Sequence, residues 1–270
     1  MSGSSPRVAL SIAGSDSGGG AGIQADLATF SALGVFGTTA VTAVTAQSTT
    51  GVRRVDVLRP ESVVSQVEAV LEDLEVAAVK TGMLAEAGLV VAVAELAASG
   101  RLPHLVLDPV MVASSGAVLA SPEAVAAYRS RLLPLAEIAT PNLAEAAVLA
   151  GVQGAGARDQ EALACRLGEA YATTVVVKGG HTTGESVADV LWRDGEITRF
   201  ERPRLTSTNT HGSGCSFAAA ITAGLALGAG LPEAVEAAGW YVQRAIAGAS
   251  GWELGHGPGP LDHFGWGSRQ

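Results

Sequence analysis

The sequence predicts an α/β protein with a mainly parallel central sheet, helices on both faces and a small antiparallel edge. Short β-type runs bounded by turns alternate with longer Ala-rich runs along the chain. The short runs are mainly apolar and do not alternate with polar residues, which is typical of parallel strands that are covered on both faces. Two late β-type runs are joined through Asp194-Gly195, a dipeptide typical of a hairpin turn.

The elements follow in order from this alternation. Apolar, turn-bounded runs predict strands at 8–13, 38–44, 77–79, 105–107, 137–139 and 174–177, and a hairpin at 187–192 and 197–202. The Ala-rich stretches predict helices at 23–33, 60–74, 87–99, 122–133, 143–150, 159–171, 216–227 and 232–250. Ligands of such sheets bind beyond the carboxyl ends of the strands, so the loops that follow the strands are where chemistry is expected.

Length and composition indicate one globular domain. The 270 residues are 48% hydrophobic and 16% charged, so they can bury a large core. We expect residues 1–6 to form a disordered tail and residues 7–270 to form a single domain. The net charge of -9 and the lack of a basic run argue against nucleic-acid binding. Two distant cysteines, Cys165 and Cys215, and no apolar run near the roughly 18 residues of a membrane span predict a cytoplasmic protein.

The most informative segment is 209–215, Asn-Thr-His-Gly-Ser-Gly-Cys, which leads into a helix. At a helix N-terminus several backbone N–H groups point outward without an intrahelical acceptor, so Gly212, Ser213 and Gly214 are expected to hold a phosphate. Cys215 falls in the first turn, where the helix dipole is expected to lower the pKa of its thiol. The alternative is a glycine-rich helix cap above a buried thiol.

Two common nucleotide motifs are missing. The glycine-rich stretch 14–22 does not match the dinucleotide fingerprint, because position 23 is Ile. The pair Lys80-Thr81 follows Val79 where a phosphate-binding loop of the Walker type requires glycine. A dinucleotide-dependent oxidoreductase is therefore disfavoured.

Other side chains in the loops suit a small heterocycle. Asp26 is either a solvated first-turn acid or a carboxylate that accepts from a ligand amine. Gln47 can recognise the edge of a heterocycle. Met83 and Val110 bring apolar side chains to the same rim, as pocket lining or as core.

Asp108, Asn142 and Glu145 supply oxygen atoms that suit hydrated Mg²⁺. Asn142 and Glu145 are also the expected pair of a helix capping box. Lys178 follows an apolar strand and can place an ammonium over phosphates, or it is an exposed strand-end lysine. Together with the turn at 212–214, these groups match the parts needed for phosphoryl transfer.

Six blocks in order resemble the hydroxymethylpyrimidine/phosphomethylpyrimidine kinases of thiamine biosynthesis, which have the ribokinase-like fold. The blocks lie at 19–26, 80–84, 107–111, 140–143, 178–181 and 209–215. The resemblance implies ATP-dependent phosphorylation of 4-amino-5-hydroxymethyl-2-methylpyrimidine and then of its monophosphate. It also implies a homodimer.

The resemblance further implies roles for individual residues. The aminopyrimidine is expected to contact Asp26 and Gln47 in a pocket lined by Gly14, Met83 and Val110. ATP is expected at Lys178, Asn142 and His211. Mg²⁺ is expected at Asp108, Asn142 and Glu145, largely through water. Gly212, Ser213 and Gly214 would form the anion hole, and Cys215 would be the base or a contact on the phosphate side.

The chain departs from the family pattern at two positions. Ser114 stands where lysine or threonine is often found, and His256 stands where relatives often have lysine. The alternatives are a pyridoxal kinase of the same cysteine-bearing subgroup and, more distantly, a non-catalytic pyrimidine-binding protein.

Overall fold

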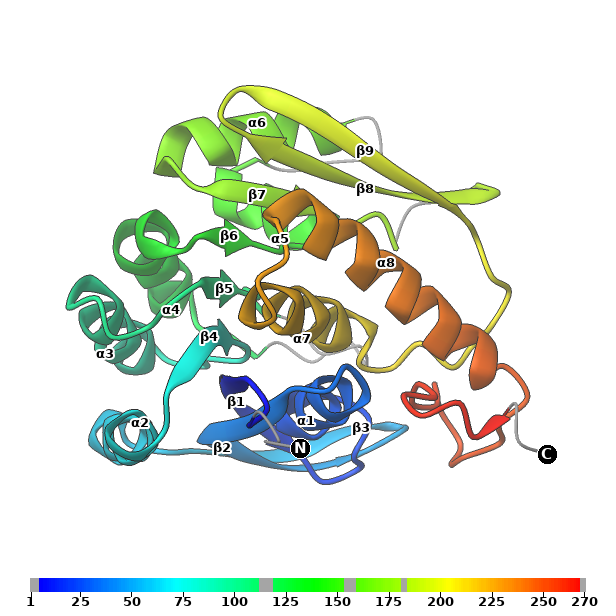
Figure 1. Ribbon diagram of the computed structural model, residues 1–270, viewed down its shortest axis with the longest axis horizontal. Coiled ribbons are helices and arrows are strands. Elements are labelled where there is room, and N and C mark those ends of the chain that lie inside the picture. The colour runs from blue at the N-terminus through cyan, green and yellow to red at the C-terminus, as the bar shows by residue number, and fades with distance from the viewer. Residues whose placement is uncertain (1–4, 112–118, 153–158, 181–183, 268–270) are drawn as a thin grey trace.

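The computed structural model describes residues 5–111, 119–152, 159–180 and 184–267. Its centre is a nine-stranded sheet in the order β3-β2-β1-β4-β5-β6-β7-β8-β9 (Figure 1). The strands β2, β1, β4, β5, β6 and β7 run parallel, and β3 at one edge and β8 and β9 at the other are antiparallel. The predicted fold class is confirmed.

The strands of the parallel part are short and apolar at its centre. They are β1 (Val8–Asp16), β2 (Phe36–Ser48), β4 (Val76–Thr81), β5 (Leu105–Leu107), β6 (Ile138–Ala139) and β7 (Thr174–Val177). The antiparallel strands are β3 (Gly51–Val57), β8 (Ser186–Arg193) and β9 (Glu196–Pro203).

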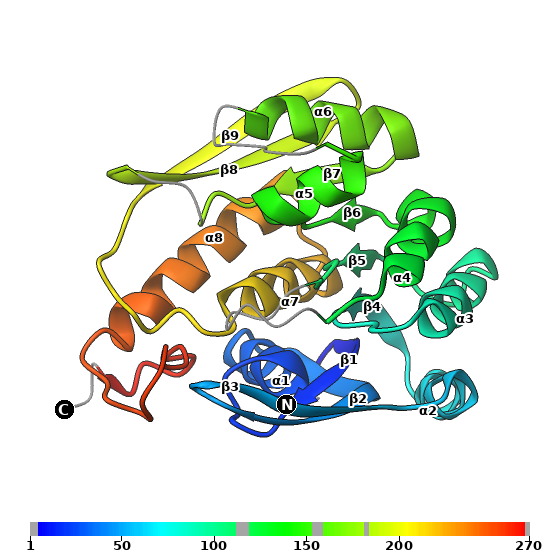
Figure 2. The ribbon, with the colours of Figure 1, turned by 180° about the vertical axis from the view of Figure 1, so that it is seen from behind.

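Helices cover both faces of the sheet. One group is α1 (Gly22–Ala32), α7 (Ser213–Ala226) and α8 (Leu231–Gly248). The other is α2 (Pro60–Asp73), α3 (Ala87–Ala98), α4 (Pro122–Ala127), α5 (Leu143–Ala150) and α6 (Gln160–Tyr171). In Figure 1, α7 and α8 lie on one side of β4 to β6, and α3 and α4 lie on the other. The view from behind brings α5 and α6 to the front beside β7 (Figure 2).

The side chains of the sheet divide into two cores. On the α7 face the strands present mostly small residues, and α7 itself is rich in Ala and Gly, so helix and sheet approach closely. The buried residues that the parallel strands contribute to this core are Ala9, Ala78, Val106, Ile138 and Val176. The opposite face carries larger side chains such as Leu10, Ile12 and Leu107. The close approach of α7 places its N-terminus near the carboxyl ends of the parallel strands.

Three regions differ most from the prediction, and most other elements differ by one to three residues at their ends. An additional strand, β3, pairs with β2, whose length exceeds the predicted run. The helix expected at 122–133 is shorter, because α4 ends at Ala127 and continues as a π-helical turn at Tyr128–Leu132 and a 3-10 turn at Leu133–Leu135. Pro134 has no N–H to continue a helix, which explains the tighter final turn. The helix predicted to begin at 216 begins at Ser213.

Two further observations bear on the predicted organisation. Part of the predicted tail at 1–6 and the departure at Ser114 lie outside the described residues. Among the described residues, no helix combines the length and the apolar character that crossing a bilayer requires.

Candidate active site

The N-terminus of α7 is built around Gly212, the N-cap, which has a φ of +82°. A Cβ there would lie 1.8 Å from the carbonyl oxygen of Gly20, so only glycine fits against the first loop. The N–H of Ser213 donates to the Thr210 carbonyl at 3.1 Å. In the described part of the chain no acceptor faces the N–H groups of Gly214 and Cys215, and these amides are the ones available to an anion.

The thiol of Cys215 lies in the first turn of α7, as predicted, and is partly exposed. Its predicted acidity is wrong. Although one side reaches solvent, desolvation by the surrounding protein raises the pKa of Cys215 to about 11, against the lowering effect of the Lys80 ammonium and the Gly22 N–H. Asp26 and Asp108 raise it further. Burial and two carboxylates therefore outweigh the Lys80 ammonium and the Gly22 N–H, and the ligand-free site holds a thiol at neutral pH.

Beneath this rim lies a buried ion pair that the sequence analysis did not recognise. The Lys80 ammonium donates to Asp26 Oδ1 at 2.8 Å, and both side chains are fully buried. Asp26 Oδ2 accepts from the Ser11 hydroxyl at 2.6 Å. Asp26 is therefore not a solvated first-turn acid, and a direct contact with a ligand amine requires one of these partners to give way. The only sequence signal was a lysine at the end of an apolar strand.

Asp108 and Lys178 meet from neighbouring parts of the sheet. Lys178 Nζ donates to Asp108 Oδ1 at 2.9 Å, and the Thr140 hydroxyl donates to the same oxygen at 3.1 Å. The Lys178 side chain is only 13% exposed, so it is not an exposed strand-end lysine. Burial opposes its charge, but Asp108 and Glu145 raise the pKa of Lys178 above its ordinary value. A Cβ on Gly214 would lie 3.3 Å from Lys178 Nζ, which places the ammonium beside the free amides of α7.

Asn142 and Glu145 form the capping box of α5. Asn142 Oδ1 accepts from the Glu145 N–H at 2.9 Å, and Glu145 Oε2 accepts from the Asn142 N–H at 2.8 Å. Burial raises the pKa of Glu145 to about 7, with Lys178 lowering it and Asp108 raising it. Asn142 Oδ1 and Glu145 Oε2 are thus occupied at the start of the helix.

The oxygen atoms of Asp108, Asn142 and Glu145 determine how well this edge of the sheet suits Mg²⁺. Asp108 Oδ2 is buried and has no hydrogen-bond partner within the described residues, so it is a free ligand oxygen at this edge. The described residues contain no cluster of three His, Cys, Asp or Glu side chains that could hold a metal. The residues suit a hydrated ion that is bound through one carboxylate and through phosphate oxygens, rather than a closed protein cage.

A second cluster joins the first loop to the turn before α7. His211 Nε2 lies 3.0 Å from Asp16 Oδ2 and 3.2 Å from Gln47 Nε2. Asp16 also accepts from the N–H groups of Gly18, Gly20 and Ala21. Burial alone would raise the pKa of Asp16, but the bonds from His211 and from the N–H groups of Gly18 and Ala21 lower it overall. The sequence analysis did not identify Asp16 as a site residue, because an acidic residue in a glycine-rich stretch is common in ordinary loops.

The predicted apolar contacts also assemble at this edge. A Cβ on Gly14 would lie 2.6 Å from Met83 Cε, so the methionine packs over the glycine. Met83 is 8% exposed, and its carbonyl accepts from the Thr42 hydroxyl at 2.7 Å. Val110 is half-buried.

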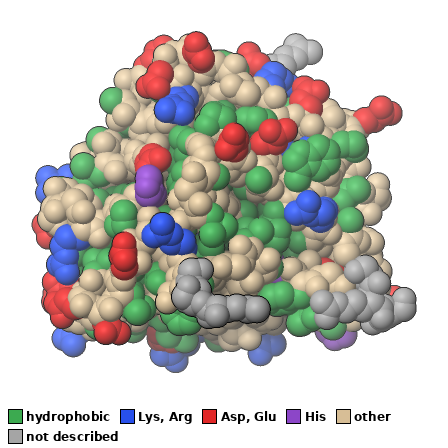
Figure 3. Space-filling model, viewed as in Figure 1, with side chains coloured by type: hydrophobic (Ala, Val, Ile, Leu, Met, Phe, Trp, Pro, Cys, Tyr) green, Lys and Arg blue, Asp and Glu red, His purple; other side chains and the backbone are tan. Residues whose placement is uncertain are grey.

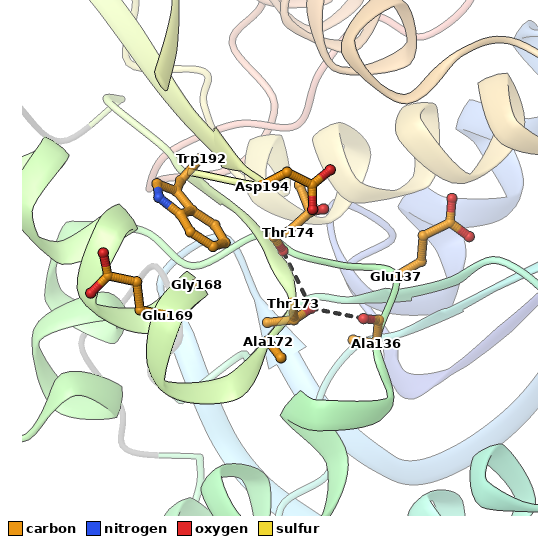
Figure 4. A pocket seen from close by; sticks show the side chains of 9 residues that line it. All are labelled: Ala136, Glu137, Gly168, Glu169, Ala172, Thr173, Thr174, Trp192 and Asp194. Carbon is orange, nitrogen blue, oxygen red and sulfur yellow. Dashed lines mark hydrogen bonds between the residues drawn. The ribbon is translucent and has the colours of Figure 1, made fainter. Parts of the chain in front are cut away.

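A pocket of about 470 Å³ lies at the opposite end of the parallel strands, where β6 and β7 begin (Figure 4). It is lined by the ends of α6 and β8 and by the starts of β6 and β7, and Trp192 packs against Gly168. Its charged lining residues are Glu137, Glu169 and Asp194, which would repel a phosphate. Figure 3 shows basic and acidic side chains interspersed on one face of the molecule, without a basic field. Within the described residues, the groups suited to a phosphate gather at the carboxyl ends of the parallel strands, beside the start of α7.

A mainly parallel α/β sheet, with an anion-binding helix N-terminus, a buried lysine and carboxylates at one edge, defines a small-molecule phosphotransferase of the ribokinase-like class. Comparison with known proteins supports this class. The family model described as phosphomethylpyrimidine kinase matches residues 16–262. The chain belongs to this family.

Individual relatives give the same result. The chain is 50% identical to the hydroxymethylpyrimidine/phosphomethylpyrimidine kinase of Rhizobium meliloti, over 95% of this chain and 97% of that protein. It is 45% identical to the Escherichia coli kinase of the same name, with the same shares covered. A phosphomethylpyrimidine kinase structure from Clostridium difficile has a TM-score of 0.77 at 38% identity, covering 88% of this chain and 99% of that chain. The ADP complex of Bacillus subtilis pyridoxal kinase has a TM-score of 0.88 at 36% identity, covering 96% and 98%.

Proposed function

We propose that this chain transfers the γ-phosphoryl group of ATP to the hydroxymethyl group of 4-amino-5-hydroxymethyl-2-methylpyrimidine, and then to the phosphate of the product. The observation that carries the proposal is the meeting of Lys178, Asp108 and the free amides of α7 at the edge of the sheet where Cys215 also lies. Family membership supplies the pyrimidine as acceptor. By the same family argument, we expect a cytoplasmic homodimer.

The acceptor side of the site is assigned to the cluster around Gln47. The Gln47 amide offers a donor and an acceptor to the aminopyrimidine edge, while Gly14, Met83 and Val110 form apolar contacts with the ring. His211 lies on Gln47, so we place it with the acceptor side and not with ATP. In this proposal Asp26 does not contact the acceptor directly, because its carboxylate is paired with the buried Lys80 ammonium beneath the site.

The transfer side is assigned to Lys178 and the first turn of α7. The acceptor oxygen forms a bond to the γ-phosphorus, and the bond from that phosphorus to the β–γ bridging oxygen breaks, which releases ADP. The Lys178 ammonium and the amides of Gly214 and Cys215 neutralise charge on the phosphoryl oxygens. The hydroxyl proton passes to Cys215 if the bound site contains the thiolate, and to a phosphoryl oxygen if the thiol stays protonated.

The charge of the ATP phosphates would be partly neutralised by Mg²⁺ when it is bound with the nucleotide. Asp108 is the residue that would hold it, through its unpartnered Oδ2. Asn142 and Glu145 would orient its water molecules from the start of α5.

A transfer assay with mass detection tests the proposed activity. The purified chain is incubated with ATP and, separately, with hydroxymethylpyrimidine, its monophosphate and pyridoxal. We expect the monophosphate and then the diphosphate of the pyrimidine, with a higher kcat/KM for the pyrimidine than for pyridoxal. A higher value for pyridoxal would support the second candidate, a pyridoxal kinase, which the structural likeness to the Bacillus subtilis enzyme favours. Binding without turnover would indicate a pyrimidine-binding protein.

A further inference from the structure

We propose that Gln160, Asp189 and Arg202 act as positioning residues for Lys178 and so control the binding of ATP phosphates. These three side chains, here called the Lys178 clamp, are only 4%, 3% and 6% exposed. The clamp lies below the rim and acts through the backbone on either side of Lys178. The inference rests on the proposed contact of Lys178 with ATP.

Gln160 holds the residue before Lys178. Its side-chain Nε2 donates to the Val177 carbonyl at 2.8 Å and to the Ala188 carbonyl at 2.7 Å. The last register pair of β7 and β8 is Val177 with Val190, so the backbone ladder stops where Lys178 begins. The Gln160 amide bridges the two strands at this point, and both of its N–H donors are used.

Asp189 holds the residue after Lys178. Its Oδ1 accepts from the Gly179 N–H at 2.9 Å, and its Oδ2 accepts from Arg202 Nη2. A Cβ on Gly179 would lie 2.0 Å from the Ala188 carbonyl oxygen, so the chain passes this point as closely as glycine allows. The backbone of Lys178 is thereby fixed relative to β8.

Arg202 connects this anchor to α8. A Cβ on Gly239 would lie 2.2 Å from Arg202 Nη1, so the guanidinium packs directly on the helix backbone. The Lys178 N–H itself donates to the Pro141 carbonyl at 2.9 Å, next to the start of α5. The backbone around Lys178 is therefore held at three consecutive residues, while its ammonium contacts Asp108.

The fixed backbone matters because the Lys178 ammonium is a point charge. Unlike the planar guanidinium of arginine, it cannot orient itself on a phosphate through two parallel hydrogen bonds. Its effect on a phosphate depends on where the backbone places it, and displacements of about 1 Å at such positions cost large factors in rate. A clamp that serves only folding would affect both substrates alike. A clamp that positions Lys178 should affect ATP selectively.

The test compares five variants of the full chain by KM for ATP, KM for the pyrimidine, kcat, calorimetric affinity for a non-hydrolysable ATP analogue, and Tm. We expect Gln160→Leu, and the double variant Asp189→Ala with Arg202→Met, to raise the KM and Kd for the nucleotide by roughly tenfold. The pyrimidine KM should stay within about twofold. The double variant leaves no unpaired buried charge, which a single change at Asp189 would do. A second double variant, Asp189→Asn with Arg202→Met, keeps an acceptor for the Gly179 N–H without leaving a buried charge unpaired, so it should restore most of the nucleotide affinity.

The matched control is Thr173→Val at the opposite end of β7. The buried Thr173 hydroxyl donates to the Ala136 carbonyl at 2.7 Å, so its loss should lower Tm without changing either KM. Equal changes in both KM values for the clamp variants, or a nucleotide effect in Thr173→Val, would overturn the inference. Lys178→Met separates the two proposals. If Lys178→Met leaves the affinity for the nucleotide unchanged, the proposed role of Lys178 in ATP binding is wrong. If Lys178→Met lowers this affinity and the clamp variants do not, only the proposed role of the clamp is wrong.

Discussion

At the residue scale, opposing effects act on the pKa of the Cys215 thiol. The Lys80 ammonium and the Gly22 N–H favour a thiolate, whereas burial and two nearby carboxylates oppose it. Burial is the largest effect, so the balance lies with the thiol. This bears directly on whether the residue can accept a proton from the substrate.

The pH dependence of thiol alkylation checks this balance. In ligand-free protein carrying Cys165→Ser, the rate of iodoacetamide reaction at Cys215 should rise about tenfold per pH unit from about pH 7 to about pH 10, because the pKa is raised to about 11. A plateau below about pH 8.5 would show a thiolate at neutral pH and contradict this assignment.

His211 is predicted to serve the acceptor and not ATP. Changing His211→Ala removes the side chain that joins Asp16 to Gln47, so the KM for the pyrimidine should rise by roughly tenfold while that for ATP changes little. Steady-state kinetics measures both. His104→Asn, at an exposed contact with Glu137 at the other edge, is the control. A selective rise in the KM for ATP would return His211 to the nucleotide side.

The sequence allowed site residues to be named at this scale, but not their partners. Lys178 and Asp108 were identified because each follows an apolar strand, and the structure brings them into contact. The pairing of Lys80 with Asp26 joins residues 54 positions apart, and no local pattern reports such a contact. The same holds for Asp189, whose partners are the Gly179 N–H and the Arg202 guanidinium.

At the scale of the element, α7 depends on a left-handed backbone conformation at its N-cap, Gly212. Gly212 has a positive φ and touches the Gly20 carbonyl, so two constraints act at one residue. At the other end of the same helix, Gly228 has a similar φ of +86° but no atom within 4 Å of an added Cβ. The two positions therefore separate conformational strain from steric conflict.

The prediction compares Gly212→Ala with Gly228→Ala. Both changes impose a left-handed conformation on alanine, at a cost of about 1 kcal/mol. Gly212→Ala must also displace the first loop, so it should lose several-fold more stability and most of the transfer activity. Urea unfolding and the transfer assay measure these effects. Equal losses in both variants would remove the steric argument for this turn.

Most elements could be predicted because their signals are local. Continuous apolar runs located the central strands, and two of them match at both ends, β5 and β7. The strand β3 was missed, because its exposed Arg53 and Arg54 lie on an edge where no apolar pattern is needed. The early end of α4 was missed because the apolar pattern continues through the π-helical turn.

At the scale of the whole molecule, the sheet order brings together residues that lie far apart in the chain. Strands β2, β1, β4, β5, β6 and β7 are parallel, so their carboxyl ends share one edge. The first loop and the start of α7 meet there through Gly20 and Gly212. The general position of the site could therefore be predicted from the fold class, whereas the burial that reverses the acidity of Cys215 could not.

The stability of the whole fold carries a pH-dependent contribution from His263. Burial lowers the pKa of His263 from 6.5 to about 4, with Asp262 acting in the opposite direction. The unfolded chain therefore binds a proton that the folded chain does not, between these two values. The contribution of His263 is fully present above pH 6.5 and is lost as the pH falls toward about 4.

The variant His263→Gln tests this contribution. Glutamine does not titrate and can still accept from the Tyr241 hydroxyl, which lies 2.9 Å from His263 Nδ1. The free energy of unfolding should fall less steeply in the variant than in the parent chain between about pH 6.5 and about pH 4, by up to about 3 kcal/mol. Parallel profiles from urea titrations would contradict the burial argument.

The most direct test of the account is a crystal structure of the chain with a non-hydrolysable ATP analogue and hydroxymethylpyrimidine. The account predicts that γ-phosphate oxygens lie within about 2.7 to 3.2 Å of the N–H groups of Gly214 and Cys215 and of Lys178 Nζ, with the acceptor hydroxyl beside the Cys215 thiol. A γ-phosphate bound away from the first turn of α7, or an acceptor bound apart from Gln47, would contradict it.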